Sequence, residues 1–370
     1  MLSDLGARVI KVETPDGGDD TRGWGPPFIG AESAYFLGVN RNKESLTLNL
    51  KDPRGRDILL RLLTRAEVLV ENFRPGIMDR FGLGYAALHE RFPRLVYASI
   101  SGFGQDGPYR ERTAYDLILQ GMGGVMGITG EEGGPPVKVG VAIADICAGM
   151  YAAYGILAAL RVRERAGQGQ LVDAALLDGQ VSWLTYAAGY YFATGQSPER
   201  LGSGHPTIVP YQAFQTADGY VNVAVGSEAI WRRFAELVDP RLLDDPRYAT
   251  NRERVVHRKE LVVHLEGLLK RKTTRQWTEA FDAAGVPCGP ILTVEDVFAD
   301  PQVAHRGMVQ EVDHATVGRV KQTGLPVKLS DTPGRIRSAP PALGQHTDAI
   351  LEELGLDGNA IADLRREGVV

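Results

Sequence analysis

Cysteine is scarce in this chain of 370 residues, and several motifs built from cysteine or histidine are missing. The only two cysteines, Cys147 and Cys288, show no pairing pattern, which is typical of a protein from the reducing cytoplasm. Neither lies in a CxxC pair, and none of the seven histidines lies in an HExxH motif or an i, i+4 pair. We therefore expect a cytoplasmic protein without a metal site.

The chain also lacks basic blocks and long hydrophobic runs. Its formal net charge is −5, with Lys and Arg scattered along it, so we expect neither nucleic acid nor a membrane as a partner. The longest apolar run, Ile146 to Leu160, has 15 residues, whereas a membrane-spanning helix needs about 20. The opening MLSDLGARVIKVE shows no signal peptide. These absences predict a soluble protein.

Two catalytic signatures are absent as well. The chain has no G-x-S-x-G nucleophile elbow and no G-x-x-x-x-G-K-[ST] phosphate loop. The glycine-rich stretch QGMGGVMGITGEEGGPP, residues 120–136, does not fit G-x-G-x-x-G, and no strand pattern leads into it. We interpret it as a flexible loop that covers a pocket.

What the first half of the chain does contain is an alternation of strand and helix patterns. Strands are predicted at 7–13, 45–50, 67–72 and 95–101, and helices at 53–66 and 85–92. Asp52 followed by Pro53 is a helix start signal. This alternation predicts an α/β fold with a parallel sheet covered by helices.

The N-terminal stretch LSDLGARVIKVE is unusual because it reads as the end of a helix, a stop at Gly6 and then a strand. It is either the second half of a β-α-β unit whose first strand lies upstream or a short N-terminal strand. The pattern alone leaves both readings open.

The length predicts two domains, because single cores usually stop growing at about 250–300 residues. The Gly- and Pro-rich segment GQSPERLGSGHPTIVPYQ marks a boundary, and YQAFQTADGYVNVAVG predicts a hairpin about Asp218–Gly219. We expect a large domain at 1–195, a small α+β domain at 196–305 and a terminal segment at 306–370.

Asp145 is the one charged residue in VGVAIADICAGMYAAYGILAAL, where a lone ionised group costs several kcal/mol unless something compensates it. The structural interpretation is an N-cap of a helix over Ile146–Val162. The chemical interpretation is a carboxylate nucleophile, kept ionised by the helix N-terminus and surrounded by small residues. The two interpretations are compatible.

A set of blocks then resembles one known family. LGARVIKVE, GDDTRGWGPP, NKESLTLNLKDPRG, VENFRPG, ASISGFGQDGPY, AYDLILQGMGG, ADICAGMYAAYGILAAL, AGVPCGPI and GQHTDAILEELG are similar, in order, to the family III CoA-transferases. They extend over nearly the whole chain. The resemblance implies a Rossmann-like large domain, a smaller α+β domain and an interlinked homodimer whose terminal segment returns to the large domain.

By this resemblance Asp145 is the catalytic residue, and the rivals Asp173 and Asp178 are structural. The implied reaction moves CoA from a donor acyl-CoA to a carboxylic acid through an aspartyl anhydride and an aspartyl-CoA thioester. The substrates are acyl-CoA and small carboxylic acids, and coenzyme A acts as a substrate without any metal. GHPTIVPYQAF resembles the branch that uses short dicarboxylic acids with succinyl-CoA as donor.

The resemblance also assigns ligand contacts residue by residue. The CoA contacts it implies are Leu48, Lys51, Asn72, Phe73, Arg74, Arg80, Tyr115 and Asp116. Gly202 and Gly204, in LGSGHP, correspond to a glycine-rich loop that closes over the reacting acyl group.

Two departures from the family stand out. Thr14 occupies a position where some members have a CoA-binding Arg, and members usually continue further upstream of LGARVIKVE. The second departure favours a missing first strand, and with it weaker CoA binding than in an extended chain.

Two other functions are considered. In a 2-methylacyl-CoA racemase the Asp is paired with a His, but Tyr115 holds that position here, and a phenol with a pKa near 10 is a poor base. A non-catalytic acyl-CoA-binding protein would not need Asp145.

Overall fold

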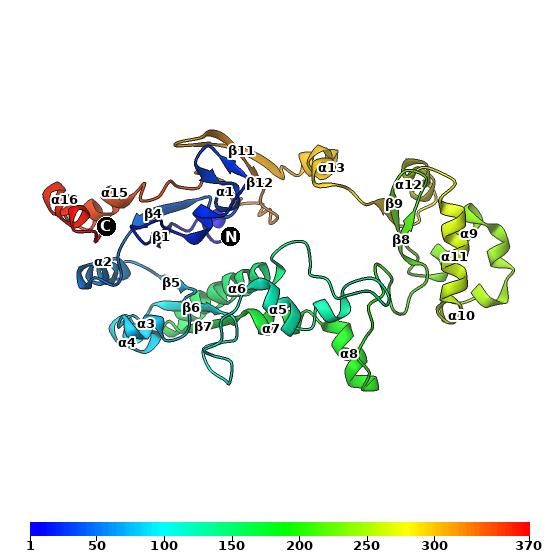
Figure 1. Cartoon of the computed structure of the whole chain (residues 1–370), viewed down its shortest axis with the longest axis horizontal. Coiled ribbons are helices and arrows are strands. Elements are labelled where there is room, and N and C mark those ends of the chain that lie inside the picture. The colour runs from blue at the N-terminus through cyan, green and yellow to red at the C-terminus, as the bar shows by residue number, and fades with distance from the viewer. The chain divides into compact units, whose positions relative to one another are not determined.

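The computed structural model describes residues 1–370, which form two compact units (Figure 1). The first unit contains residues 1–123, 141–183 and 298–370, and the second contains residues 124–140 and 184–297. The chain thus leaves the first unit twice, after Gly123 and after Trp183, and returns at Val141 and at Phe298, whereas the sequence placed only the boundaries at 195 and 305.

The first unit holds most of the strands. Its strands are β1 (Val9–Glu13), β2 (Phe28–Ile29), β3 (Glu32–Ser33), β4 (Lys43–Thr47), β5 (Val68–Glu71), β6 (Val96–Ser101), β7 (Leu171–Ala175), β11 (Val309–His314) and β12 (Gly318–Thr323). Its helices are α1 (Ala34–Val39), α2 (Pro53–Leu63), α3 (Ile77–Arg80), α4 (Tyr85–Arg91), α5 (Asp116–Met122), α6 (Ile143–Ala166), α7 (Leu176–Ser182), α14 (Pro301–His305), α15 (Thr347–Glu353) and α16 (Gly358–Arg366), with 3-10 turns η1 (Ser3–Leu5) and η2 (Asp20–Gly23).

The strands β1, β4, β5 and β6 of the first half of the chain, with β7, pair in parallel, as the alternation of strand and helix patterns predicts. They form two separate sheets, one of β1 and β4 and one in the order β5-β6-β7. Two antiparallel pairs, the two-residue strands β2 and β3 and the longer β11 and β12, accompany them. The fold class is therefore mixed α/β with parallel sheets.

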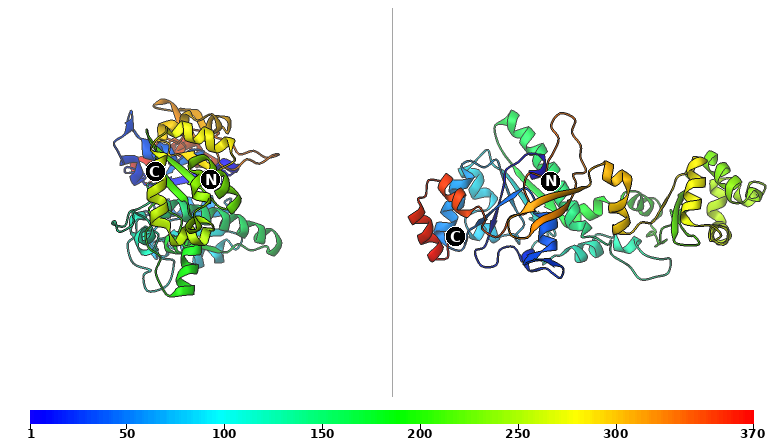
Figure 2. Two further views of the ribbon diagram at one scale, coloured as in Figure 1. Left: turned by 90° about the vertical axis from the view of Figure 1, so that its right-hand side faces the viewer. Right: turned by 90° about the horizontal axis from the view of Figure 1, so that it is seen from above.

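The two faces of β6 belong to different cores, because successive side chains of a strand point to opposite faces. Val96 and Ala98 pack against Ile156 and Ala159 of α6, and α6 lies along β6 and β7 (Figure 2). Tyr97 faces the other way, into a second cluster. The helix that carries Asp145 is thus packed directly on the sheet.

The second cluster brings the two ends of the chain together. Leu46 and Leu48 pack there with Ile350 and Leu351 of α15 and with Ile361 of α16. The contact is also polar, since the Thr47 N–H donates to Oγ1 of Thr347 at 3.0 Å. The C-terminal helices therefore complete the core beside β4.

Two local signals in the sequence, the helix start at Asp52 and the stop at Gly6, act as predicted. Asp52 caps α2 by accepting a hydrogen bond from the Arg54 N–H at 2.8 Å, with Pro53 at the first helical position. Gly6 ends η1 with φ +116°, a conformation that favours glycine. The strand that follows begins at Val9.

The second unit is an antiparallel sheet covered by helices. Its strands are β8 (Tyr211–Gln215), β9 (Tyr220–Ala224) and β10 (Cys288–Pro290), in the order β10-β9-β8. Its helices are α8 (Thr185–Thr194), α9 (Glu228–Val238), α10 (Asn251–Val256), α11 (Arg258–Leu269) and α12 (Thr274–Ala283), with 3-10 turns η3 (Met126–Ile128), η4 (Pro240–Leu243) and η5 (Pro246–Tyr248). The helix α13 (Val294–Ala299) lies where the chain passes back to the first unit.

The hairpin predicted about Asp218–Gly219 is confirmed, because β8 and β9 pair in antiparallel register across it. Behind this sheet lies an aromatic core in which Phe281 stacks on Trp277 and Phe234. Helices α9 and α12 supply these rings. The second unit thus has a core of its own.

Candidate active site

Asp145 lies in the first turn of α6 and is not its cap. The helix begins at Ile143 with Ala142 at the N-cap position, so the N-cap role predicted for Asp145 is wrong. The Asp145 carboxylate is exposed in the single chain and takes part in no hydrogen bond or ion pair. It still lies at the positive end of a 24-residue helix.

Asp116 provides the cap that the sequence assigned to Asp145. It opens α5, and its Oδ1 accepts a hydrogen bond from the Ala144 N–H at 2.8 Å. Its Oδ2 accepts one from Nε2 of Gln120 at 2.7 Å. The cap comes from a separate helix, so no pattern near Asp145 could have indicated it.

The electrostatics of Asp145 follow from this arrangement. Burial by neighbouring protein raises the pKa of its carboxyl, and the nearby negative charge of Asp116 raises it further. A carboxylate with a raised pKa is a stronger base and nucleophile than an ordinary aspartate. It is also costly to leave ionised, as expected for a functional residue.

Two aromatic residues that the sequence did not single out lie beside this pair. Burial raises the pKa of the Tyr35 phenol, and the charges of Asp145, Asp116 and Asp19 add to the effect, so Tyr35 lies within electrostatic range of both acids of the pair. Trp24 packs edge-on against Tyr35, with ring centres 5.0 Å apart. Both rings are partly exposed. The two rings form an apolar surface near Asp145. In the sequence, only the block GDDTRGWGPP, which contains Trp24, pointed to this surface.

Of the two CoA contacts predicted after β4, the Leu48 side chain is buried and the Lys51 side chain is exposed. Leu48 is 2% exposed and packs in the core with Leu46 and Ile350, so its side chain cannot touch a ligand. That prediction needs correction, because only the main chain of Leu48 could reach CoA. Lys51 is exposed, and its N–H donates to Oδ1 of Asn49 at 3.0 Å.

The predicted contacts after β5 are held in a turn. Glu71 ends the strand, and its Oε2 accepts a hydrogen bond from the Phe73 N–H at 2.9 Å. Asn72, Phe73 and Arg74 are all exposed, and so is Arg80 at the end of α3. The structure therefore leaves these side chains free to meet a ligand.

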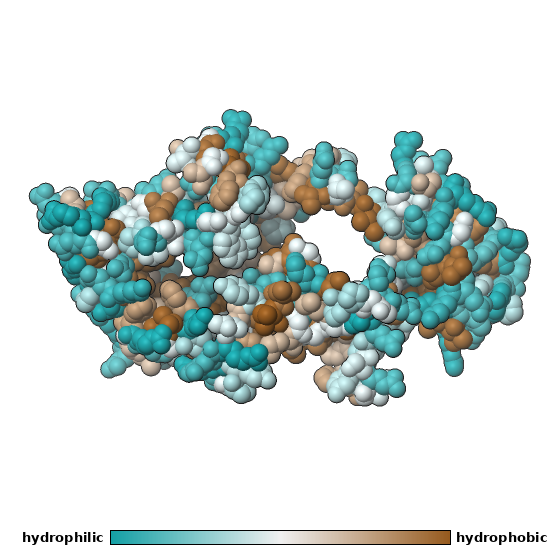
Figure 3. Space-filling view, viewed as in Figure 1, coloured by the Kyte–Doolittle hydropathy of each residue, from teal (hydrophilic) through white to brown (hydrophobic).

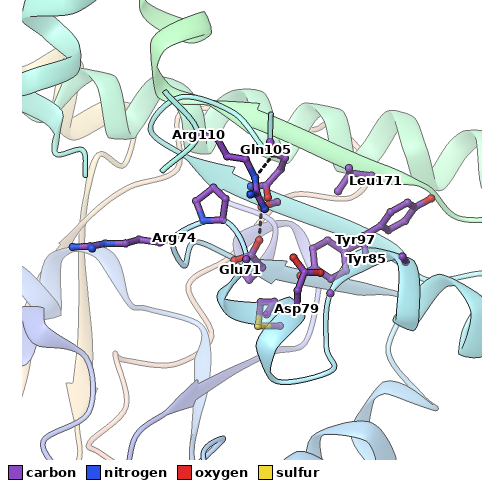
Figure 4. A pocket seen from close by; sticks show the side chains of 14 residues that line it. Glu71, Arg74, Asp79, Tyr85, Tyr97, Gln105, Arg110 and Leu171 are labelled. Atoms are coloured by element: carbon purple, nitrogen blue, oxygen red, sulfur yellow. Dashed lines mark hydrogen bonds between the residues drawn. The ribbon is translucent and has the colours of Figure 1, made fainter. Parts of the chain in front are cut away.

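A cavity of about 190 Å³ lies beside that turn (Figure 4). Its polar lining includes Glu71, Arg74 and Arg110 but not Asp145. Burial raises the pKa of Glu71, although its carboxylate also accepts a hydrogen bond from Ser99. Of the predicted ligand contacts only Arg74 lines this cavity, and in Figure 4 its side chain extends outward.

Tyr115 precedes α5 and is 73% exposed. The structure brings its neighbour Asp116 to α6 but leaves the phenol in solvent. Asp173, one of the rival acids, accepts a hydrogen bond from the Gln105 N–H at 2.9 Å and so anchors the loop after β6.

The glycine-rich loop belongs to the second unit. Gly202 has φ +58°, and its N–H donates to the Gly130 carbonyl at 2.8 Å. Its positive φ favours glycine, whereas a Cβ there would meet only the flexible end of the Glu131 side chain, Oε2 at 2.9 Å. Arg200 donates to the carbonyls of Gly127 and Gly134. The loop at 200–204 thus packs on part of the stretch predicted to cover a pocket.

No group of three or more His, Cys, Asp or Glu side chains is arranged to hold a metal ion. The expectation of a reaction without a metal stays a prediction.

Comparison with known proteins identifies the family. The sequence pattern of CoA-transferase family III matches residues 1–347. The chain belongs to CoA-transferase family III. As a family III member it is an enzyme, a CoA-transferase.

This family III CoA-transferase has close relatives. Human succinyl-CoA:glutarate CoA-transferase is 44% identical over 371 residues, covering 100% of this chain and 85% of the human protein. The succinate–glutarate CoA-transferase of Agrobacterium fabrum is 43% identical, covering 96% of this chain and 90% of that protein. A CAIB/BAIF family protein from Brucella suis has a similar crystal structure, with a TM-score of 0.85, 44% identity and coverage of 95% of this chain and 93% of that one.

Proposed function

We propose that this enzyme transfers CoA from succinyl-CoA to a short dicarboxylic acid, with Asp145 as the nucleophile. The observation that carries the proposal is an exposed, unpaired carboxylate with a raised pKa in the first turn of α6. The substrates named for its relatives support the choice of donor and of acceptor class, since two of them are named for succinate or succinyl-CoA and for glutarate.

In the first half of the reaction CoA passes from the donor acyl-CoA to Asp145. A carboxylate oxygen of Asp145 attacks the thioester carbon of succinyl-CoA, the C–S bond breaks, and an anhydride and CoA thiolate form. The thiolate then attacks the aspartyl carbon of the anhydride. This step releases succinate and leaves CoA on Asp145 as a thioester.

The second half runs in the opposite direction. The acceptor carboxylate attacks the aspartyl thioester carbon, which again gives an anhydride and CoA thiolate. The thiolate attacks the acceptor's acyl carbon, so the new acyl-CoA leaves and the Asp145 carboxylate is restored. No proton or electron is gained or lost over the cycle.

The surroundings of Asp145 suit these steps. Trp24 and Tyr35 offer an apolar surface against which the methylene chain of a dicarboxylic acid can pack. We propose that Lys51, Arg74 and Arg80 contact the phosphates of CoA, and that Asn72 and Phe73 contact its adenine. Each of these side chains is exposed, as ligand contacts need to be.

The racemase alternative gains no support from the surroundings of Asp145. Inversion needs an acid and a base on opposite faces of the substrate, and the residue in the position of the racemase histidine is the exposed phenol of Tyr115. The third alternative, a non-catalytic acyl-CoA-binding protein, leaves the unpaired Asp145 without a role.

The test is a transfer assay followed by mass spectrometry. The enzyme is incubated with succinyl-CoA and a series of dicarboxylic acids of increasing length, with Asp145→Ala alongside. We expect new acyl-CoA species with the wild type only, and a CoA adduct on the peptide that contains Asp145. Exchange of the α-proton of 2-methylacyl-CoA with deuterium, without transfer, would instead establish a racemase.

We further propose a cytoplasmic homodimer. The first unit exposes large apolar side chains on α5 and α6, among them Ile118, Met150, Tyr154 and Leu157. Figure 3 shows apolar patches on one face of the molecule. Such a surface is unusual for a monomer.

By length and composition alone α6 could span a membrane, but Asp145 and Arg163 lie within it. A monomer by light scattering, or a protein that stays in solution only with detergent, would contradict this proposal.

A further inference from the structure

Glu13, the last residue of β1, is buried and bonded at both oxygens. Its side chain is 1% exposed, and Arg22 donates to it twice, Nε to Oε2 at 2.7 Å and Nη2 to Oε1 at 2.8 Å. Oγ of Ser45 and the Asp19 N–H add hydrogen bonds of 2.7 and 3.1 Å. A bidentate pair with further hydrogen bonds fixes the orientation of both side chains.

Arg22 extends this network into the loop that carries Trp24. Its Nη1 and Nη2 donate to the Pro341 carbonyl at 3.3 and 3.2 Å, and its guanidinium carbon lies 3.8 Å from the centre of the Phe36 ring. Two residues further on, the Trp24 carbonyl accepts a hydrogen bond from Oγ of Ser33 at 2.5 Å. The loop is thus tied to β1, to α1 and to the C-terminal segment.

The same loop reaches the proposed catalytic carboxylate. The Trp24 ring packs edge-on against the Tyr35 ring with ring centres 5.0 Å apart, and the Tyr35 phenol lies within electrostatic range of Asp145 and Asp116. Tyr35 follows directly on Ala34 in α1, the helix whose next residue, Phe36, is covered by Arg22. Trp24 lies two residues after Arg22 in the same loop. Tyr35 precedes Phe36, the ring on which the Arg22 guanidinium packs.

We propose that Arg22, held by Glu13, is a positioning residue that sets the Trp24–Tyr35 surface relative to Asp145. This surface orients the acyl chain so that its carboxyl carbon meets the Asp145 oxygen. The inference rests on the proposed function, because it assigns a partner to the acyl chain of the transferred acid. Lysine at position 22 would keep the charge but lose the two-point contact with Glu13, since an ammonium group cannot form the planar fork of a guanidinium.

The first unit contains a matched control. Arg41 donates from Nε and Nη2 to Asp4 at 3.1 and 2.9 Å and also to the carbonyl of Thr323. Its side chain is 13% exposed, close to the 10% of Arg22. Unlike Arg22, Arg41 does not pack on the Phe36 ring and makes no hydrogen bond to Glu13 or Pro341. Arg41→Lys therefore weakens a comparable ion pair that does not hold the Trp24 loop.

The experiment compares Arg22→Lys with Arg41→Lys. Steady-state rates are measured with succinyl-CoA and the preferred acid, binding of free CoA by calorimetry, and thermal unfolding for both variants. The chain has four tryptophans, so labelling with 5-fluorotryptophan gives resolved fluorine resonances, and Trp24→Phe identifies that of Trp24.

We expect Arg22→Lys to lower kcat/KM for the acid by about tenfold to a hundredfold, the effect of a small misplacement of reacting groups. Its affinity for free CoA stays within about twofold of the wild type, and its Trp24 resonance moves. Arg41→Lys loses similar thermal stability but keeps both its kcat/KM and its Trp24 resonance.

Equal kinetics in the two variants, or a rate loss without movement of the Trp24 resonance, would overturn the inference. An inactive wild type would refute the proposed function itself. The fluorine spectrum would then still test Arg22, because an unmoved Trp24 resonance in Arg22→Lys overturns the positioning role without any assay of transfer.

Discussion

Two carboxylates of the first unit have opposite surroundings, Glu13 at the end of β1 and Asp145 in the first turn of α6. Burial works to raise the pKa of Glu13, but hydrogen bonds from Arg22 and Ser45 outweigh it, so the pKa is lowered. For Asp145, burial and the charge of Asp116 both raise the pKa, and no donor opposes them. Both oxygens of Glu13 accept hydrogen bonds, whereas those of Asp145 accept none.

This contrast separates an engaged carboxylate from an unpaired one within one unit. Breaking a buried ion pair is costly, whereas an unpaired carboxylate with a raised pKa is the kind of group found at functional sites.

Replacing Asp145 by Asn should lower the transfer rate by about three orders of magnitude or more, as loss of a nucleophile does. The same change should raise the melting temperature at pH 7. Folding raises the pKa of Asp145. The free energy of unfolding therefore falls as the pH rises from the unfolded pKa of this carboxyl through its folded pKa, and at pH 7 the ionised side chain destabilises the fold. Kinetics and calorimetry on one preparation check both parts, and an unchanged or lower melting temperature would contradict the second.

Replacing Glu13 by Gln should destabilise the enzyme by about 3 kcal/mol, because the half-buried Arg22 loses its bidentate charge partner and keeps only Glu32 at 4.0 Å. The pKa of Glu13 is lowered on folding. Its contribution is therefore present above the unfolded pKa of about 4.3 and is lost as the pH falls through the folded pKa. Urea unfolding of both proteins at several pH values measures this, and a difference that persists at the lowest pH would count against the ion pair.

Replacing Asp116 by Asn should move the acid limb of the kcat/KM profile to lower pH. An amide oxygen can still cap α6 at Ala144, but the negative charge that raises the pKa of Asp145 is gone. The measurement is the pH dependence of transfer with wild type and variant. A limb that stays in place or moves to higher pH would show that Asp116 does not act on Asp145 through its charge.

Replacing Glu164 by Gln is the surface counterpart of the Glu13 change. Glu164 pairs with Arg161 on the exposed side of α6, with side chains 60% and 65% exposed. Water and salt screen such a pair, so we expect a change of about 0.5 kcal/mol or less in unfolding free energy. An effect as large as that of Glu13→Gln would mean that burial is not what distinguishes the two pairs.

Sequence patterns predicted the elements better than the site. The cap at Asp52, the stop at Gly6 and the hairpin about Asp218–Gly219 were all predicted, since each signal acts over a few neighbouring residues. Asp145 was singled out, but its capping role was wrong because α6 starts at Ile143. Leu48 was placed at a ligand, although the packing of α15 and α16 around β4 buries its side chain.

Asp145 could be singled out from the chain itself, because a single charged residue in a long apolar stretch stands out. Its catalytic role came from the family resemblance and stays a prediction. Its chemistry depends on groups that are distant in sequence. The cap from Asp116 lies 28 residues before the N–H that it satisfies. Tyr35 precedes β4 in the chain, whereas Asp145 follows it by about a hundred residues. Hydrogen bonds and charges act through space over a few ångströms, so only folding brings Asp116 and Tyr35 to Asp145.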